Sequence, residues 1–202
     1  MSRTLFTSRD GGDLKDFARR ESLRVDLSME HFLFMHQTHS DTVLVVDGSE
    51  DEPKCDALVT TRKGVALAAM AADCMPVTFT SDQVVGIAHV GRVGLVKGIA
   101  QKTVEVMQGL GAGKISAQIG PSICAKCYEV SLEMYVEVTS AIPETATSPA
   151  LHSLNLQSGV TAQLTALGVE VENVDICTLE NPEYFSYRGG DLSSRQAGVI
   201  SL

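Results

Sequence analysis

Three side chains that commonly bind metal ions each follow or end a predicted β-strand: His39, Cys74 and His89. Cys74 follows the apolar run 65–72, and Pro76 cannot donate to a sheet ladder, so the strand must end or bulge there. Zinc prefers cysteine and histidine, and catalytic zinc sites use three protein ligands and one open position. Spacings of 35 and 15 residues match no local zinc motif. Convergence therefore depends on the fold, and taken singly each residue also suits an ordinary structural role.

Other residues near these positions could bind an anion or a flat base. Asp73 precedes Cys74 and could act as a base or as a hydrogen-bond acceptor for a ligand. Arg92 lies in a glycine-rich turn before a predicted helix, where backbone N–H groups can face an anion, although such a turn is also ordinary chain geometry. Aromatic and cationic candidates for base stacking and phosphate binding lie near the C-terminus: Phe185, Tyr187, Arg188 and Arg195. The alternative is a loop that closes the core with Phe185.

The five cysteines do not indicate a disulfide framework, because their number is odd and the chain is not small. Cys124 and Cys127 form a single C-x-x-C motif, which lacks the second pair of a four-cysteine zinc site. A redox pair is one interpretation, and packing or an incidental pair is the favoured one. We expect Cys55 and Cys177 to be structural.

The hydrophobic pattern predicts strands in the first half of the chain and strands alternating with helices in the second. Segments 57–61 and 65–72 resemble a hairpin, as do 77–80 and 84–88. Helices are expected over residues 14–23, 95–110, 132–142 and 156–167, and further strands over 32–35, 42–46, 115–119, 169–177 and 198–202. The pattern favours one α/β or α+β domain over residues 1–202 with mixed sheets, in which residues 1–30 form a less certain extension.

Composition excludes several classes of partner. The net charge of −9 and the isoelectric point of about 5.0 give an acidic surface, so we expect no nucleic-acid partner. A local basic pocket for one small anion stays open, because net charge does not describe a single site. No segment approaches the roughly 20 apolar residues of a membrane span, and the N-terminus lacks the pattern of a signal peptide. We therefore expect a cytoplasmic protein with no membrane contact.

Six short motifs follow one another along the chain and include these candidates. They are Gln37-Thr38-His39, Asp56-Ala57-Leu58-Val59-Thr60, Ala72-Asp73-Cys74-Met75-Pro76-Val77, His89-Val90-Gly91 with Gly94-Leu95, Gly120-Pro121-Ser122-Ile123 with Cys127-Tyr128-Glu129-Val130, and Ser186-Tyr187-Arg188 with Arg195-Gln196. In this order they resemble the YfiH-type family, long called multicopper polyphenol oxidase or laccase-domain proteins and more recently purine nucleoside phosphorylases. The resemblance covers about residues 31–202, and six motifs in the right order are hard to obtain by chance.

The resemblance implies a layered α/β fold with two mixed sheets, helices outside, and zinc bound by His39, Cys74 and His89. It also implies that adenosine, inosine or methylthioadenosine is split by phosphate to the free base and ribose-1-phosphate, and family members also deaminate adenosine. Zinc could lower the pKa of a water for attack on the amine carbon, or orient phosphate as the nucleophile. Cys74 would bind as a thiolate. We expect a monomer or a small homo-oligomer.

Two positions depart from the family's pattern, because Val93 and Gly189 stand where it has arginines. How phosphate binds is thus left open, and a weakly active family member stays an alternative. Another is a cysteine hydrolase or deamidase with Cys74 as nucleophile and His89 as its base. A copper polyphenol oxidase is disfavoured, because five histidines and one candidate cluster cannot supply both a blue-copper and a trinuclear centre.

Overall fold

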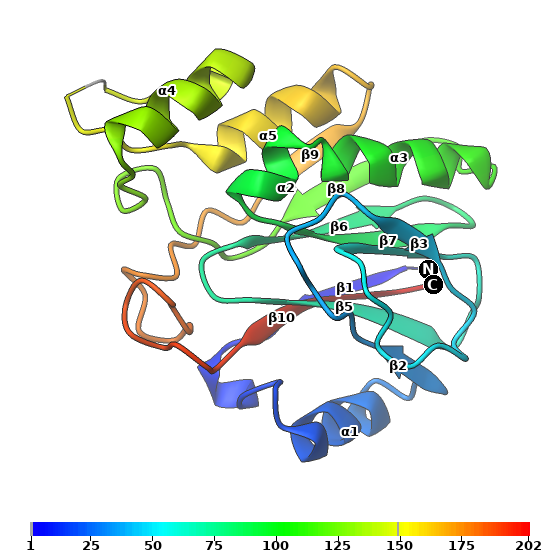
Figure 1. Cartoon of the computed structure of the whole chain (residues 1–202). Coiled ribbons are helices and arrows are strands. Elements are labelled where there is room, and N and C mark those ends of the chain that lie inside the picture. Colours follow the sequence, from blue (N-terminus) through cyan, green and yellow to red (C-terminus); the bar gives the residue numbers. More distant parts are fainter. Residues whose placement is uncertain (1, 149) are drawn as a thin grey trace.

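Two β-sheets lie face to face, and helices cover their outer sides (Figure 1). The computed structural model describes residues 2–148 and 150–202. The strands are β1 (Arg3–Phe6), β2 (His31–Leu33), β3 (Val43–Val45), β4 (Ala57–Thr60), β5 (Val65–Ala71), β6 (Met75–Thr80), β7 (Val85–Val90), β8 (Ser116–Ile119), β9 (Glu170–Asn173) and β10 (Gln196–Ser201). The helices are α1 (Phe17–Asp26), α2 (Arg92–Val96), α3 (Ile99–Gly109), α4 (Leu132–Ala141) and α5 (Leu156–Thr165), with short 3-10 turns η1 (Arg9–Gly11) and η2 (Pro143–Thr145).

Both sheets are mixed. The smaller has the order β1-β10-β5-β2 and the larger β3-β4-β7-β6-β8-β9. β2 runs parallel to β5 and β8 parallel to β9, whereas β6 and β7 are antiparallel. β1 pairs antiparallel with β10, so the two ends of the chain lie side by side (Figure 1). The expected fold class, an α+β layered sandwich with mixed sheets and outer helices, is confirmed.

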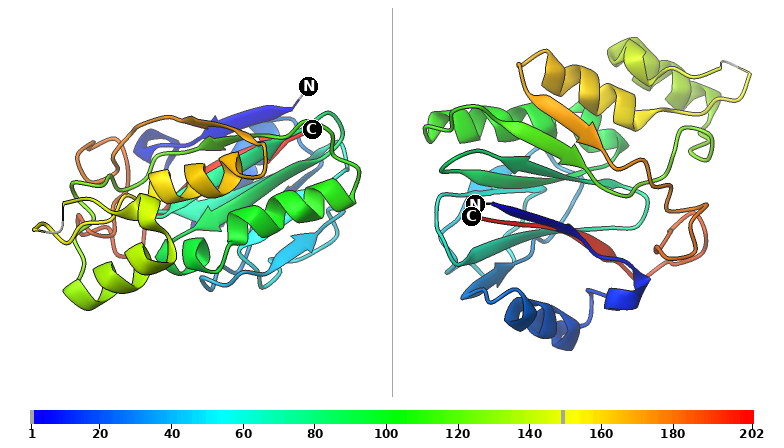
Figure 2. Two further views of the ribbon diagram at one scale, coloured as in Figure 1. Left: turned by 90° about the horizontal axis from the view of Figure 1, so that it is seen from above. Right: turned by 180° about the vertical axis from the view of Figure 1, so that it is seen from behind.

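Three apolar clusters hold the layers together. Leu58, Leu67 and Ile87 belong to the cluster between the two sheets. Leu14 and Phe34 belong to a second cluster, where α1 and its flanking segments cover the smaller sheet, and the remaining helices pack on the larger sheet (Figure 2). Within residues 2–148 and 150–202, no helix is both long and apolar enough to span a bilayer.

The hairpin predicted from segments 57–61 and 65–72 is wrong, because β4 lies in the larger sheet and β5 in the smaller one. Residues 62–64 carry the chain from one sheet to the other. Both strands are almost wholly buried, so their apolar runs hold no information about which neighbour they pair with. The hairpin predicted from 77–80 and 84–88 is confirmed as β6 and β7.

The single helix predicted over residues 95–110 is two helices. α2 ends at Val96 and α3 begins at Ile99, because Gly98 between them takes a left-handed conformation with φ of 74°. The strand predicted over 169–177 stops at Asn173, which leaves Cys177 in an irregular segment. β1 also forms within residues 1–30, which the hydrophobic pattern predicted only as a less certain extension.

Candidate metal centre

His39, Cys74 and His89 meet at the edge where β6 begins and β7 ends. Their potential ligand atoms all lie within 4.8 Å of one another. Cys74 lies in the segment between β5 and β6, and His89 of β7 is directly opposite Pro76 of β6. His39 comes from the segment between β2 and β3, and its ring meets the His89 ring edge-on, with 4.8 Å between centroids. One strand and two connecting segments thus bring together residues far apart in the sequence.

The buried carboxylate of Asp56 orients two of these three residues. It accepts the backbone N–H groups of residues 38–40 at 2.6 to 3.1 Å, which holds His39 in a left-handed conformation with φ of 56°. Its Oδ1 also lies 2.9 Å from Nδ1 of His89, so the Nε2 atom of that ring is left to face the cluster. Burial raises the pKa of Asp56, but hydrogen bonds from His89 and Ser40 outweigh this and hold the pKa well below its usual range.

The charges of the cluster favour a thiolate at Cys74. Burial raises the pKa of this thiol, but the charge of His89 and hydrogen bonds from both histidines outweigh burial and lower the pKa to about 6. Burial likewise lowers the pKa of His89, whereas the Cys74 thiolate and Asp56 raise it to about 9. Because the thiolate is both the nucleophilic and the metal-binding form of cysteine, the site is prepared for either chemistry.

Gly91 leaves the room that the cluster needs. A Cβ atom at this position would lie 3.0 Å from Sγ of Cys74 and 3.0 Å from Cδ2 of His39. Such distances are tighter than most Cβ contacts in proteins, so a side chain at this position would require Cys74 and His39 to shift. The glycine-rich turn that the sequence suggested as an anion site therefore packs against Cys74 and His39.

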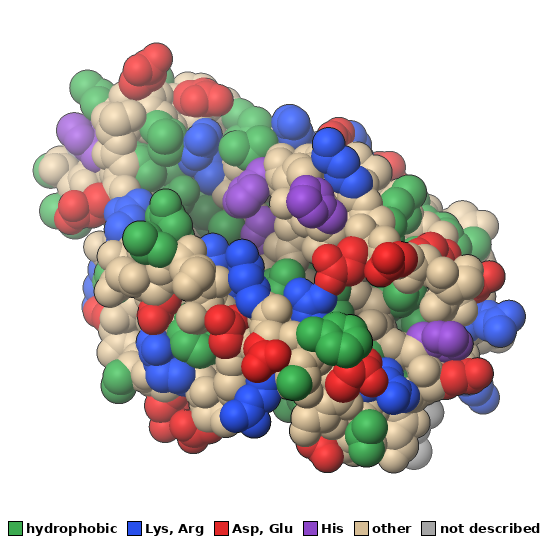
Figure 3. Space-filling view, turned by 60° about the horizontal axis from the view of Figure 1, so that its bottom comes forward, with side chains coloured by type: hydrophobic (Ala, Val, Ile, Leu, Met, Phe, Trp, Pro, Cys, Tyr) green, Lys and Arg blue, Asp and Glu red, His purple; other side chains and the backbone are tan. Residues whose placement is uncertain are grey.

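The cluster opens into a cavity of about 700 Å³. Figure 3 shows histidine side chains beside a hollow in the surface, with Lys and Arg side chains close by. Two acidic residues, Glu52 and Asp73, line the cavity, and four basic ones do: Lys15, Arg20, Arg188 and Arg195. The lining is therefore net positive although the whole chain carries a charge of −9.

Asp73 anchors the loop that forms one wall of this cavity. Its Oδ1 accepts the hydroxyl groups of Thr178 at 2.8 Å and Ser186 at 2.7 Å. Its Oδ2 accepts the backbone N–H of Arg188 at 2.7 Å. Asp73 itself has a φ of 84°, an unusual conformation for a residue other than glycine, which these three bonds hold in place.

Of the C-terminal candidates, three line the cavity and one does not. Tyr187 is exposed within the lining, beside Arg188, and the guanidinium of Arg195 donates to main-chain carbonyls of residues 191, 192 and 194. Phe185 is buried and outside the lining, with the Arg9 guanidinium 4.4 Å from its ring centroid. For Phe185, the structure therefore agrees with the alternative interpretation, in which the C-terminal loop closes the core.

Arg92 also lies outside the lining, with its guanidinium 3.9 Å from the carboxylate of Glu137. Tyr128, a cavity residue, lies near two arginines. The guanidinium carbon of Arg188 is 5.4 Å from its ring centroid, and Arg92 is close enough to act on the pKa of its phenol. Burial and the Cys74 thiolate raise the pKa of the Tyr128 phenol, and the charges of both arginines oppose this rise.

Sequence reasoning did not name Lys15, Arg20, Asp56 and Tyr128 as site residues. Asp56 and Tyr128 lie inside two of the six motifs, so the motifs already held a signal for them. Lys15 and Arg20 lie in the weakly patterned first 30 residues. The Arg20 guanidinium lies 4.1 Å from the Phe34 ring centroid and pairs with Glu52, contacts that no sequence period encodes.

The donor set can hold a metal ion. Two imidazoles and one thiolate match the ligands that zinc prefers, and three protein ligands leave a further position toward the cavity. The carboxylate behind His89 is the partner that metal-binding histidines usually have. Among residues 2–148 and 150–202, this is the one metal-competent cluster that contains histidine.

Comparisons with known proteins place these features in context. The chain is 42% identical over 194 residues to purine nucleoside phosphorylase ORF3 of Streptomyces griseus, covering 91% of this chain and 79% of the relative. It is 31% identical over 193 residues to adenosine deaminase RL5 from an unknown prokaryotic organism, covering 83% of this chain and 73% of the relative.

Two crystal structures share the architecture. A Neisseria meningitidis protein, NMB0706, aligns with a TM-score of 0.88 and 27% identity over 100% of this chain and 94% of that one. YfiH of Bacillus licheniformis aligns with a TM-score of 0.78 and 26% identity over 92% of this chain and 80% of that one. A family model described as multi-copper polyphenol oxidoreductase laccase matches residues 10–202. The chain therefore belongs to this laccase-like family, the YfiH-type family that its six motifs resemble.

Proposed function

We propose that this chain is a zinc-dependent purine nucleoside phosphorylase. The observation that carries the proposal is an open cluster of three side chains that can bind a metal, inside a net-positive cavity of an acidic protein. The name of the Streptomyces griseus relative supports the same reaction class. The substrates would be phosphate and a purine nucleoside such as adenosine, inosine or methylthioadenosine.

Zinc would be held by His39, Cys74 and His89, with Asp56 fixing the orientation of the His89 ring. When bound there, zinc would act as a Lewis acid on a substrate oxygen. Copper is the less suitable ion, because the described residues lack the several histidine-rich centres of a multicopper oxidase.

Phosphate would bind to the cations of the cavity. Arg188 has its backbone N–H on Asp73, while its guanidinium makes one hydrogen bond, to the carbonyl of Glu129 at 3.1 Å. The other guanidinium N–H groups can meet two phosphate oxygens together. Lys15 forms no ion pair with a described residue, and Arg195 adds charge. These residues would take over from the arginines that are absent at positions 93 and 189.

The purine would lie against the aromatic side of the cavity, where Tyr128 and Tyr187 offer flat faces. Stacking on one ring contributes about 0.5–1.5 kcal/mol beyond the buried area. In phosphorolysis a phosphate oxygen bonds to C1′ of the ribose as the C1′–N9 bond breaks, and the leaving base takes up a proton. Arg188 would position the phosphate, and Asp73 would act through it as a positioning residue.

Deamination of adenosine is the second activity we propose for the same cavity, supported by the name of the RL5 relative. Here water replaces the amino group at C6 of the purine and ammonia leaves. Both reactions need a bound purine, but only phosphorolysis consumes phosphate.

The test is to incubate zinc-loaded protein with adenosine, with and without phosphate, and to separate the products. Adenine and ribose-1-phosphate that form only with phosphate support phosphorolysis. Inosine as the sole product in both incubations would mean that the protein deaminates adenosine and does not phosphorolyse it. Absence of any turnover would favour the weakly active family member.

A pair of arginine variants locates the phosphate site. Arg188→Ala is expected to raise the KM for phosphate by about 10-fold or more, because a charge-assisted pair contributes about 1.5–3 kcal/mol. Arg62→Ala removes an exposed arginine outside the cavity and serves as the matched control. An unchanged phosphate KM in Arg188→Ala would contradict the assignment.

One observation favours a second candidate, a cysteine hydrolase or deamidase. The lowered pKa of Cys74 and the raised pKa of His89 describe a thiolate–imidazolium pair, which is how cysteine nucleophiles are activated. Removal of zinc with a chelator distinguishes the two candidate functions. A phosphorylase loses activity with its zinc, whereas a cysteine hydrolase keeps it and is instead blocked by alkylation of Cys74.

A further inference from the structure

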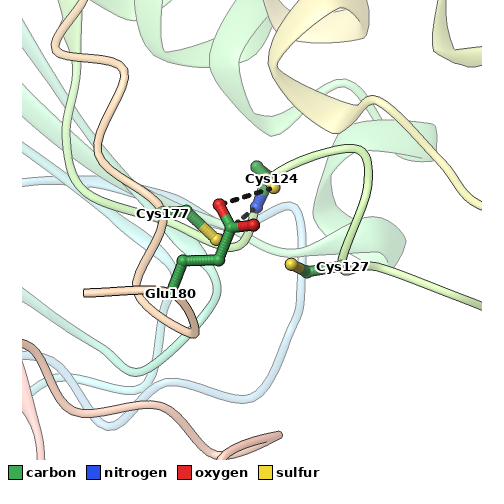
Figure 4. Close-up of side chains that lie close together, drawn as sticks. All are labelled: Cys124, Cys127, Cys177 and Glu180. Atoms are coloured by element: carbon green, nitrogen blue, oxygen red, sulfur yellow. Dashed lines mark hydrogen bonds between the residues drawn. The ribbon is translucent and has the colours of Figure 1, made fainter. Parts of the chain in front are cut away.

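A second group of metal-binding side chains lies outside the cavity. The Sγ atoms of Cys124, Cys127 and Cys177 and a carboxylate oxygen of Glu180 all lie within 4.8 Å of one another. Figure 4 shows the four side chains directed toward one another from two different segments. The partners that the C-x-x-C motif lacks in sequence are therefore supplied in space by residues about 50 positions further along the chain.

The backbone holds the two segments in register. Ser122 forms an isolated parallel bridge with Cys177, donates its N–H to Ile176 at 3.1 Å, and accepts that of Thr178 at 3.2 Å. These bonds continue the pairing of β8 with β9 beyond the end of the regular sheet. The cluster thus rests on a rigid edge, which is the kind of support that a precise ligand geometry requires.

The environment of the Cys177 sulfur atom suits a metal-bound thiolate. The backbone N–H of Cys124 points at Sγ of Cys177, 3.4 Å away, and such a bond stabilises the charged form of a ligand. Sγ of Cys124 lies 3.8 Å from Oε2 of Glu180. The three cysteines are half-buried and Glu180 is exposed, so an ion could enter from solvent and be closed in by the carboxylate.

We propose that Cys124, Cys127, Cys177 and Glu180 form a structural zinc site. Three thiolates and one carboxylate complete a four-ligand set, and soft sulfur donors select zinc over magnesium or calcium. A disulfide would use two of the three sulfur atoms and would give neither the third thiol nor Glu180 a function. The convergence of all four donors therefore favours a metal over a redox pair.

The position of this site gives it a role in shaping the cavity. Cys127 precedes Tyr128, which lines the cavity, and Cys177 precedes Thr178, whose hydroxyl donates to Asp73. A zinc ion bound to both cysteines would tie the Tyr128 segment to the segment that holds Asp73. The site would stabilise the wall of the cavity without touching a substrate.

Zinc counting on the full chain tests the proposal. Reduced protein is loaded with Zn²⁺ and desalted, and its zinc content is measured. We expect two zinc ions per chain in the wild type and one in the Cys124→Ser/Cys127→Ser variant. Cys55→Ala, which removes a buried thiol outside the cluster, is the matched control and should keep both ions.

The Cys74→Ala variant distinguishes this site from the cavity cluster of His39, Cys74 and His89. The variant should retain one zinc ion, and this result does not depend on the proposed phosphorylase activity. In that variant, cobalt should give the strong sulfur-to-metal charge-transfer absorption of a thiolate-rich site. Glu180→Gln, a mild change at an exposed position, should weaken zinc binding by about 10-fold. An unchanged zinc count in Cys124→Ser/Cys127→Ser, or a stable disulfide among the three cysteines in freshly purified protein, would overturn the proposal.

Discussion

The two metal-competent clusters of this molecule differ in the completeness of their ligand sets. His39, Cys74 and His89 supply three donors, and the remaining direction opens into the cavity. The second cluster, here called the C-x-x-C cluster, consists of Cys124, Cys127, Cys177 and Glu180. It supplies four donors, three of them sulfur. Zinc proteins use the first pattern for catalysis and the second for structure. By the number of donors, the cavity cluster therefore has the pattern of a reactive site and the C-x-x-C cluster that of a structural one.

The clusters also differ in what orients them. In the cavity cluster the buried carboxylate of Asp56 accepts hydrogen bonds from two histidine segments. In the C-x-x-C cluster, backbone pairing between two neighbouring segments orients the side chains. A short path still joins them, because Thr178, next to Cys177, donates to Asp73, next to Cys74. A change in the geometry of one cluster can therefore alter the geometry of the other.

The largest effect is expected from Cys74→Ala. Losing this thiolate removes the metal from the cavity cluster, and a Lewis acid contributes several kcal/mol, so kcat should fall by about 10³-fold or more. Nucleoside turnover under saturating substrate is the measurement. Cys127→Ser should keep kcat within about 10-fold, because Cys127 contacts no substrate. Equal losses of kcat in both variants would contradict the assignment of the cavity cluster as the reactive site and the C-x-x-C cluster as the structural one.

Asp56→Asn should have the next largest effect. The neutral side chain no longer offers two charged oxygens to the N–H groups of residues 38–40 and to His89, so zinc affinity of the cavity cluster should fall about 10- to 100-fold. The free energy of unfolding should drop by about 3–5 kcal/mol, as for a broken buried charge pair. Zinc titration and urea unfolding measure these effects. The control is Asp82→Asn on the exposed β6–β7 turn, which should change neither.

Gly91→Ala tests how tightly the cavity cluster is packed. The new methyl group would press on Cys74 and His39, and overpacking of this kind costs about 1–3 kcal/mol. We expect weaker zinc binding at the cavity cluster and an unchanged C-x-x-C site. The control is Gly109→Ala near the end of α3, where a Cβ meets no atom within 4 Å. Wild-type zinc affinity in Gly91→Ala would show that the cluster can adjust.

The smallest effect is expected from Asp191→Asn. The Asp191 carboxylate accepts hydrogen bonds from the Arg9 guanidinium and the Ser186 N–H, which together hold its pKa below 3.8. A depressed pKa adds stability above the ordinary carboxyl pKa, and this contribution disappears as the pH falls through the lowered value. Asp191→Asn should therefore cost about 0.5–1 kcal/mol at pH 7 and progressively less as the pH falls below the ordinary carboxyl pKa. Urea unfolding over a series of pH values gives the comparison, and a loss that does not change with pH would contradict a charge effect.

Local patterns predicted most of the elements but not all of their partners. The β6–β7 hairpin and α4 were predictable, because a tight turn and a helical period act over a few residues. The placement of β4 and β5 in different sheets was not, since both are buried almost throughout and show no exposed face. Strand-end positions and motifs predicted the three side chains that converge at the cavity, whereas Lys15 and Arg20 reach the cavity only through the packing of α1 and its flanking segment.

Residue types and their order along the chain were enough to indicate the family, through its six motifs, and to single out the three side chains of the cavity cluster. The packing of distant segments, in contrast, brings these side chains together, places Asp56 against two of them, and adds Cys177 and Glu180 to Cys124 and Cys127. One cause applies to each of these contacts. Ligand geometry is created by contacts between segments distant along the chain, and such contacts leave no periodic trace in the order of the residues.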